Sequence, residues 1–196
     1  MTDGCALDVV RDETVRLARY ACERLRGRLV GMSDDEYFWE PVAGCWSVRR
    51  GRDGVYRQDG NESQPDPVPA PLTTIAWRVC HIIDVISSDH NATWLGLTPV
   101  ALSRRGVGEP ATATAAVDLL TEAFSAFERC LSTTDSARLT EPMGPIARAY
   151  GTYTRLSFVV HQVDELVHHG AEVATLRDLY RAMGRAGARS LVPAQT

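Results

Sequence analysis

Apolar residues recur at helical spacing in four long stretches of the chain. In residues 5–30 they form one stripe, with aspartate and arginine lying off it: Leu7, Val10, Leu17, Ala21 and Leu25. Residues 113–132 have an even clearer apolar face: Ala116, Leu119, Leu120, Ala123, Phe124, Phe127 and Leu131. Steps of three and four residues are typical of amphipathic helices, so both stretches are predicted to be helical.

Residues 72–95 carry two stripes instead of one. The first stripe is purely aliphatic: Ile75, Val79, Ile82 and Ile86. The second is Trp77, His81 and Val85, which places a histidine among apolar neighbours. Thr73 or Thr74 can cap this helix after Pro71, and Gly96 can end it.

The fourth predicted helix covers residues 154–183, and its main apolar stripe is Leu156, Val159, Val160, Val163, Val167 and Ala174. Three of the five histidines lie between residues 161 and 169. Glu165 and His169 are four residues apart and therefore lie one turn apart on the same side of the helix.

Stretches rich in glycine and proline separate the helices, at residues 37–71, 97–111 and 142–151. No strand-like alternation of useful length is present, and residues 184–196 are expected to be a frayed tail. We therefore predict an all-α fold, a four-helix bundle with a long first crossover, in a single domain over residues 1–196.

Composition narrows the class of protein. An apolar fraction of 44%, a charged fraction of 23% and a net charge of −4 are ordinary for a globular protein and give no reason to expect a nucleic acid partner. No apolar run is long enough to span a membrane, and no signal peptide is recognisable. The five scattered cysteines form no Cys-x-x-Cys pair, which favours a reducing cytoplasm. All 21 basic residues are arginine, which excludes a functional lysine.

The histidines suggest a metal site. A carboxylate and an imidazole one turn apart, as in Glu165 and His169, can share an ion with a histidine from a facing helix, and His81 is the candidate. Three protein ligands would leave coordination positions open, as in catalytic sites. Asp84 could orient the second ring nitrogen of His81. Zinc suits such a ligand set, and nickel, iron or manganese are also possible.

Other interpretations of the same residues remain open. A Glu-x-x-x-His pair is common on solvated helix faces, and a histidine in an apolar stripe is often a hydrogen-bonded core residue. His161 shares the broad face of His169 and is a rival ligand. His168 points about 100° away from His169 and is expected in an outer shell or at the surface.

Three segments together resemble the DinB/YfiT-like metalloprotein superfamily, and within it the branch of mycothiol-dependent maleylpyruvate isomerases and thiol S-transferases. They are the run from Pro71 to Ile82, the run from Asp164 to Tyr180, and the Gly44-Cys-Trp-Ser-Val-Arg49 segment. The resemblance implies an up-down-down-up bundle with a divalent metal bound by His81, Glu165 and His169. Many members have a histidine where this chain has Glu165, but the maleylpyruvate isomerases are similar in using a His, Glu, His set.

The resemblance also implies a low-molecular-weight thiol as cosubstrate, such as mycothiol. Trp46 and Trp77 could line a substrate pocket, and arginines such as Arg49 and Arg177 could receive the carboxylate of the thiol. Three functions stay open: a thiol S-transferase acting on a small electrophile, a thiol-dependent isomerase of the maleylpyruvate type, and a non-catalytic binding bundle. The protein is expected to be a monomer or a homodimer.

Overall fold

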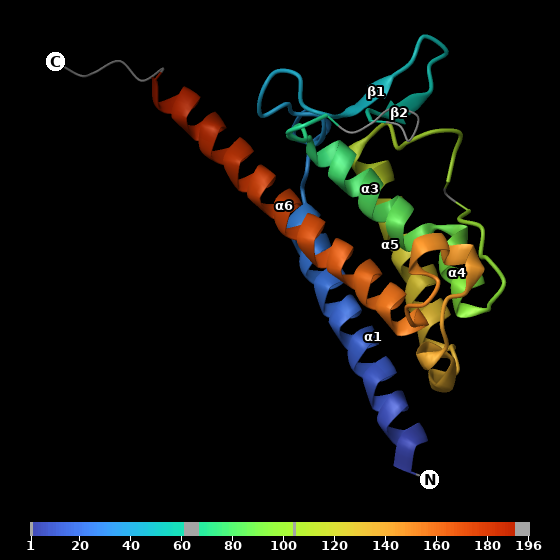
Figure 1. The fold of residues 1–196 in the computed structure, drawn as a ribbon. Coiled ribbons are helices and arrows are strands. Elements are labelled where there is room, and N and C mark those ends of the chain that lie inside the picture. The colour runs from blue at the N-terminus through green and yellow to red at the C-terminus, as the bar shows by residue number, and fades with distance from the viewer. Residues whose placement is uncertain (1, 61–66, 104, 191–196) are drawn as a thin grey trace.

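The computed structural model describes residues 2–60, 67–103 and 105–190. Four helices form the body (Figure 1): α1 (Thr2–Leu29), α3 (Ile75–Ser87), α5 (Ala113–Ser132) and α6 (Arg155–Ser190). Shorter helices join them: α2 (Asp34–Tyr37), α4 (Asp89–Leu95) and the 3-10 helices η1 (Ser136–Thr140) and η2 (Pro145–Tyr150). The predicted all-α bundle is confirmed.

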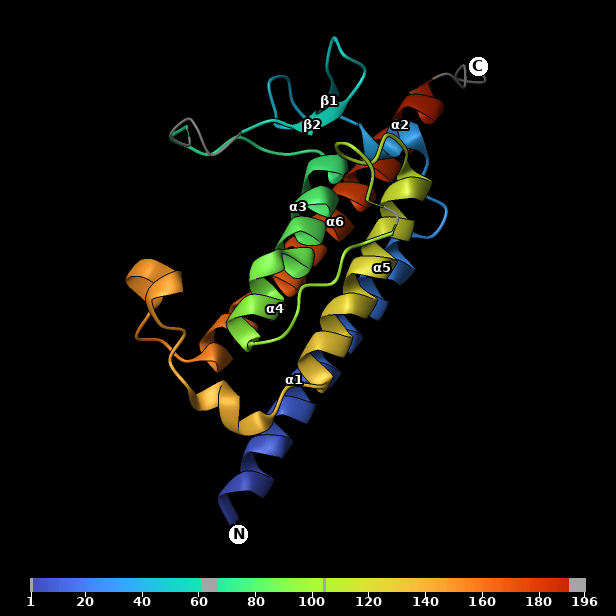
Figure 2. The same cartoon turned by 90° about the vertical axis from the view of Figure 1, so that its right-hand side faces the viewer.

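The helices run up, down, down and up, as the resemblance implied (Figures 1 and 2). Around the bundle, α1 packs on α6, α6 on α3, α3 on α5, and α5 on α1. Because α3 and α5 run in the same direction, the segment between α4 and α5 must return along the length of the bundle. Two long connections, one before α3 and one before α5, therefore end near the same end of the bundle (Figure 2).

Side-chain caps fix where several helices begin. Thr74 caps α3, its hydroxyl accepting a hydrogen bond from the backbone nitrogen of Trp77 at 3.2 Å. Ser33 caps α2 by accepting from Glu36 N at 3.1 Å. The helix predicted over 72–95 is in fact broken, because Ser88 has φ −54° and ψ 137° and its side chain caps α4 instead.

The predicted core faces of α3 and α5 are buried in the structure. The stripe assigned to the first helix is partly wrong, because Val10 and Leu17 are exposed. Ala21 and Leu25 of that stripe are buried as predicted, and the other buried residues of α1 are Val15, Ala18, Cys22 and Leu29. The face of α1 that packs on α5 and α6 thus includes small residues. Such residues are easily missed when a helix face is predicted from the spacing of large apolar side chains.

The first crossover contains a small hairpin that the sequence pattern did not indicate. β1 (Val48–Arg50) pairs antiparallel with β2 (Tyr56–Gln58), with Arg49 opposite Arg57. Strands of three residues are too short to show alternation. The hairpin lies beside the beginning of α3 (Figure 1), and Trp77 Nε1 donates to the backbone oxygen of Asp59 at 2.8 Å.

The expectation of a frayed tail from residue 184 is wrong as far as Ser190, because α6 continues to that residue. Residues 191–196 lie outside the described part of the chain. Among the described residues, no helix combines the length and apolar character needed to cross a lipid bilayer.

Candidate metal centre

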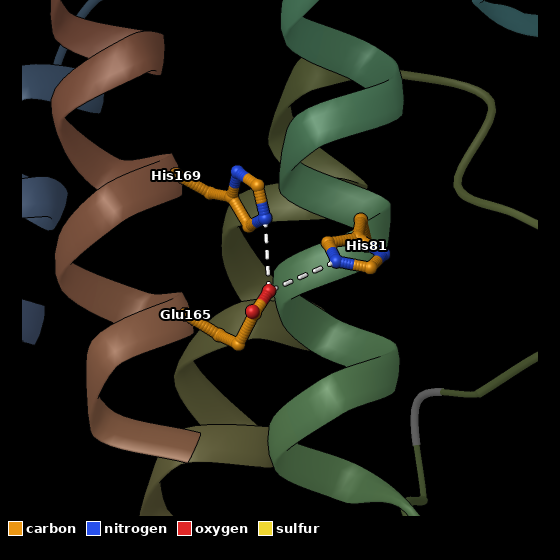
Figure 3. A group of neighbouring side chains, drawn as sticks. All are labelled: His81, Glu165 and His169. Atoms are coloured by element: carbon orange, nitrogen blue, oxygen red, sulfur yellow. Dashed lines mark hydrogen bonds and ion pairs between the residues drawn. The ribbon is translucent and has the colours of Figure 1, made fainter. Parts of the chain in front are cut away.

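His81, Glu165 and His169 converge between α3 and α6 (Figure 3). One carboxylate oxygen, Glu165 Oε2, lies 2.9 Å from His169 Nε2 and 3.3 Å from His81 Nε2. The three candidate ligand atoms lie within 4.8 Å of one another. The structure thus brings together the three residues that the sequence suggested as metal ligands.

Helix geometry explains the convergence. Glu165 and His169 are one turn apart on α6 and project to the same side, toward α3. Helices α3 and α6 pack against each other in the bundle, which brings His81 to the same level. The rings of His81 and His169 meet nearly edge to face, at an interplanar angle of 81°.

The centre is sheltered but not sealed. His169 is 7% exposed, whereas the side chains of His81 and Glu165 are 32% and 19% exposed. A solvated helix face, the alternative left open by the sequence, does not describe a buried His169. The partial exposure of His81 and Glu165 means that solvent reaches this part of the centre.

The surroundings of His81 and Glu165 favour the protonation states of these side chains that bind metals. Burial, together with the nearby His169, lowers the pKa of His81 below its ordinary value. Burial alone would raise the pKa of Glu165, but the hydrogen bond with His81 and the neighbouring histidines lower it overall. A neutral imidazole and an ionised carboxylate result, and these are the protonation states that a metal ion requires.

Glu172 and Arg78 complete the surroundings, and sequence reasoning gave them no role. Glu172 Oε2 lies 2.6 Å from His169 Nδ1, and Arg78 Nε lies 2.8 Å from the same oxygen. The spacing of three residues between His169 and Glu172 was a possible signal. No spacing in the sequence could have indicated the role of Arg78, because its partner Glu172 is on another helix.

The remaining candidates on α6 flank the centre. His161 is exposed, and its Nδ1 lies 3.8 Å from Glu165 Oε1, whereas His81 and His169 contact the other oxygen, Oε2. His168 is also exposed, and its Nε2 lies 3.5 Å from Glu172 Oε1. Neither ring contributes to the convergent trio, so both lie at its margin.

Asp84 does not orient His81. Its carboxylate accepts from Gln58 Nε2 at 2.6 Å through one oxygen and pairs with Arg105 through the other, also at 2.6 Å. The expectation is wrong because Asp84, one turn along α3, faces the hairpin and the loop before α5. It ties these two segments to α3.

The two tryptophans lie next to the centre. Trp77 stacks on His81 with ring centroids 5.1 Å apart and an interplanar angle of 14°, and Trp46 packs on Trp77 at 5.5 Å. Arg49 lies in β1, and its guanidinium is bonded to Glu40, Asp59 and the backbone oxygen of Cys45. Trp77 therefore holds the ring of His81 in place, and Arg49 is already engaged by two carboxylates.

Arg177 was expected to contact substrate, and this is wrong. Its side chain is completely buried, and two guanidinium nitrogens bind both oxygens of Glu36 at 2.6 and 2.8 Å. The third nitrogen donates to the backbone oxygens of Arg28 and Val30. Arg177 thus fastens α6 to α2 and to the end of α1, and its complete burial keeps its guanidinium away from any ligand.

The donor set fits a divalent metal. Two imidazole nitrogens and one carboxylate oxygen are the usual protein ligands of zinc and of several other first-row ions. They belong to two helices that the bundle holds rigidly. The arrangement would occupy three coordination positions and leave the rest for water or a small molecule.

Residues 18–173 match a family model described as the DinB superfamily. The matched region begins in α1 and ends in α6 after His169, so it contains all three residues of the centre. No curated protein and no solved structure matches the chain.

Proposed function

Because the chain belongs to the DinB superfamily, we propose that it is a metal-dependent thiol S-transferase. It uses a low-molecular-weight thiol of the mycothiol type as the nucleophile on a small electrophile. The thiolate sulfur forms a bond to a carbon of the electrophile, the bond from that carbon to its leaving group breaks, and the thiol proton goes to solvent. The observation that carries the proposal is the convergence of His81, Glu165 and His169 at a partly open position between α3 and α6.

These three residues would hold the metal, and zinc suits two nitrogens and one oxygen best. When bound, the ion supplies positive charge that stabilises a thiolate, the reactive form of a thiol. The protein contributes the placement of its ligands. Stacking on Trp77 holds the ring of His81, and the helical spacing of α6 sets Glu165 against His169.

The reactive thiol comes from outside the chain. Among the described cysteines, Cys80 is next to His81 in sequence, but its side chain is fully buried and its sulfur lies 3.5 Å from the hydroxyl of Tyr37. Burial raises the pKa of Cys80 far above the ordinary value of a thiol, so it stays protonated. Cys22 and Cys45 are likewise buried, with a raised pKa.

An external thiol is consistent with a reducing cytoplasm, where we place the protein. The four described cysteines Cys22, Cys45, Cys80 and Cys130 are all free thiols.

The decisive experiment measures thiol dependence. Purified protein loaded with zinc is incubated with an activated electrophile and with mycothiol, bacillithiol or glutathione, and the products are identified by mass. We expect one thiol to be consumed for each product formed and to appear in the product as a thioether. The same protein carrying His169→Ala is the control and should give only the uncatalysed rate.

Two other results would contradict the transferase. Turnover that needs the thiol but returns it unchanged would identify an isomerase of the maleylpyruvate type. Zinc-loaded protein that neither binds nor activates any of the three thiols would identify a non-catalytic binding bundle.

A further inference from the structure

Glu172 contacts Nδ1 of His169, the ring nitrogen that points away from the metal centre. Its Oε2 atom lies 2.6 Å from His169 Nδ1, while His169 Nε2 lies 2.9 Å from Glu165 Oε2. The ring of His169 is therefore held between two carboxylates, one at each nitrogen. These carboxylates do not have equivalent roles, because only Glu165 also faces His81.

An ionised carboxylate can accept a hydrogen bond but cannot donate one. His169 Nε2 also has a carboxylate oxygen within reach, but the contact of Nδ1 with Glu172 is the shorter one, 2.6 Å against 2.9 Å, and this favours Nδ1 as the nitrogen that carries the proton of a neutral His169. In a neutral imidazole, a proton on Nδ1 leaves the lone pair on Nε2. Glu172 thus directs the lone pair of His169 toward Glu165 and His81, where a metal would bind.

Arg78 keeps Glu172 in this role. Its Nε lies 2.8 Å from Glu172 Oε2, the same oxygen that receives the His169 proton. Arg78 belongs to α3, whereas Glu172 and His169 belong to α6. The two groups form an ion pair between facing helices, and the side chain of Arg78 is only 18% exposed.

The other oxygen of Glu172 faces a different histidine. Oε1 lies 3.5 Å from His168 Nε2, and the rings of His168 and His169 stack at 4.6 Å. His168 is exposed and reaches none of the three residues of the centre. It therefore offers a matched control, a histidine that touches the same carboxylate without being a candidate ligand.

We propose that Glu172, fixed by Arg78, is a positioning residue that selects the tautomer of His169 able to bind a metal. The proposal rests on the metal site of the proposed function but not on any thiol chemistry. Hydrogen bonds from a ligating histidine to a carboxylate are a general means of setting ring orientation and raising affinity. Here the carboxylate is itself held across two helices, so the site is prepared before a metal arrives.

The test compares Glu172→Ala, Glu172→Gln and His168→Ala with the unmodified protein. Zinc affinity is measured by competition with a chelating dye, and histidine tautomers are assigned by ¹⁵N NMR on the metal-free protein. We expect Glu172→Ala to weaken zinc binding about 10–100-fold and to remove the Nδ1-protonated signature of His169. Glu172→Gln keeps a carbonyl acceptor and should restore both within a few-fold, and His168→Ala should change neither.

The proposal is overturned if Glu172→Ala leaves both the zinc affinity and the tautomer of His169 as they were. The NMR measurement needs no metal, so it decides the question even if the protein proves not to bind zinc. A protein that gave the expected tautomer and affinity changes but ignored every thiol would refute the transferase and leave the role of Glu172 standing.

Discussion

His81 and His169 meet with their ring centroids 4.8 Å apart, although one belongs to α3 and the other to α6. The contact exists only because these two helices pack against each other, and Glu165 Oε2 lies within hydrogen-bonding distance of both rings. Two imidazoles around one carboxylate oxygen form a compact set of donors. The first prediction follows from that set.

Replacing either histidine of the pair should abolish metal binding. Protein purified in the presence of zinc is expected to contain about one equivalent of metal, measured by elemental analysis. His81→Ala or His169→Ala should weaken affinity by more than the ~10–100-fold typical of losing an outer partner, because a ligand itself is removed. His161→Ala is the matched control on the same helix and should retain its metal. The reverse pattern would refute this ligand assignment.

Removing Asp84 should leave metal binding intact. Its carboxylate binds Gln58 and Arg105 rather than His81, so Asp84→Ala should change zinc affinity by no more than a few-fold. The partly exposed contacts to the hairpin and to the loop before α5 would be lost, at a cost of about 1 kcal/mol in stability. Chelator competition and urea denaturation measure the two effects. A large loss of zinc affinity would show that Asp84 acts on His81 after all.

The periodic part of the chain predicted the fold well, and for a physical reason. The apolar faces of α3 and α5 repeat over several turns, and a repeat of that length is difficult to satisfy except by a buried helix. The stripe of α1 was less informative, because small residues such as Ala18 and Cys22 fill the contact while larger ones such as Leu17 remain exposed.

The contacts of the candidate site also fall into those that the sequence could predict and those that it could not. Glu165 and His169 could be paired from sequence because their relation is a property of one helix. The Glu172 contact was within reach for the same reason. The Arg78 contact, the break at Ser88 and the partners of Asp84 depend on how separate segments meet, and no spacing along the chain encodes them.

Arg177 shows most clearly what the sequence pattern could not predict. As a sequence feature it was one arginine among many near the end of a polar helix, and a carboxylate ligand was a reasonable guess for it. The structure supplies that carboxylate internally, from Glu36, and buries both groups. Periodicity alone does not reveal such a pairing, because the partner lies in a separate short helix.

Breaking the Arg177–Glu36 pair should destabilise the protein strongly. Arg177→Ala leaves the buried carboxylate of Glu36 without its bidentate partner, and such losses cost about 3–5 kcal/mol. Arg181→Ala is the control, because its side chain is exposed and its Nε lies 4.0 Å from the same carboxylate, so this contact should contribute at most about 1 kcal/mol. Urea denaturation followed by circular dichroism measures both. Equal effects of the two substitutions would contradict the structural role of Arg177.

The buried thiol of Cys22 should make the protein less stable in alkali. Burial raises the pKa of Cys22 from 9.0 to about 12 in the folded protein, whereas the unfolded chain keeps an ordinary thiol. Between these values only the unfolded state releases the proton, so the free energy of unfolding is unaffected below pH 9 and falls as the pH rises toward 12.

At pH 10.5 this one thiol should account for a loss of about 2 kcal/mol. Urea denaturation under reducing conditions at pH 8 and pH 10.5 gives the loss for the unmodified protein. Cys22→Ala should lose about 2 kcal/mol less over the same interval, because its other titrating groups are unchanged. If both proteins lost stability equally, the thiol would have to ionise as readily in the folded core as in the unfolded chain. That is incompatible with a side chain only 1% exposed, packed in the core on the bundle-facing side of α1.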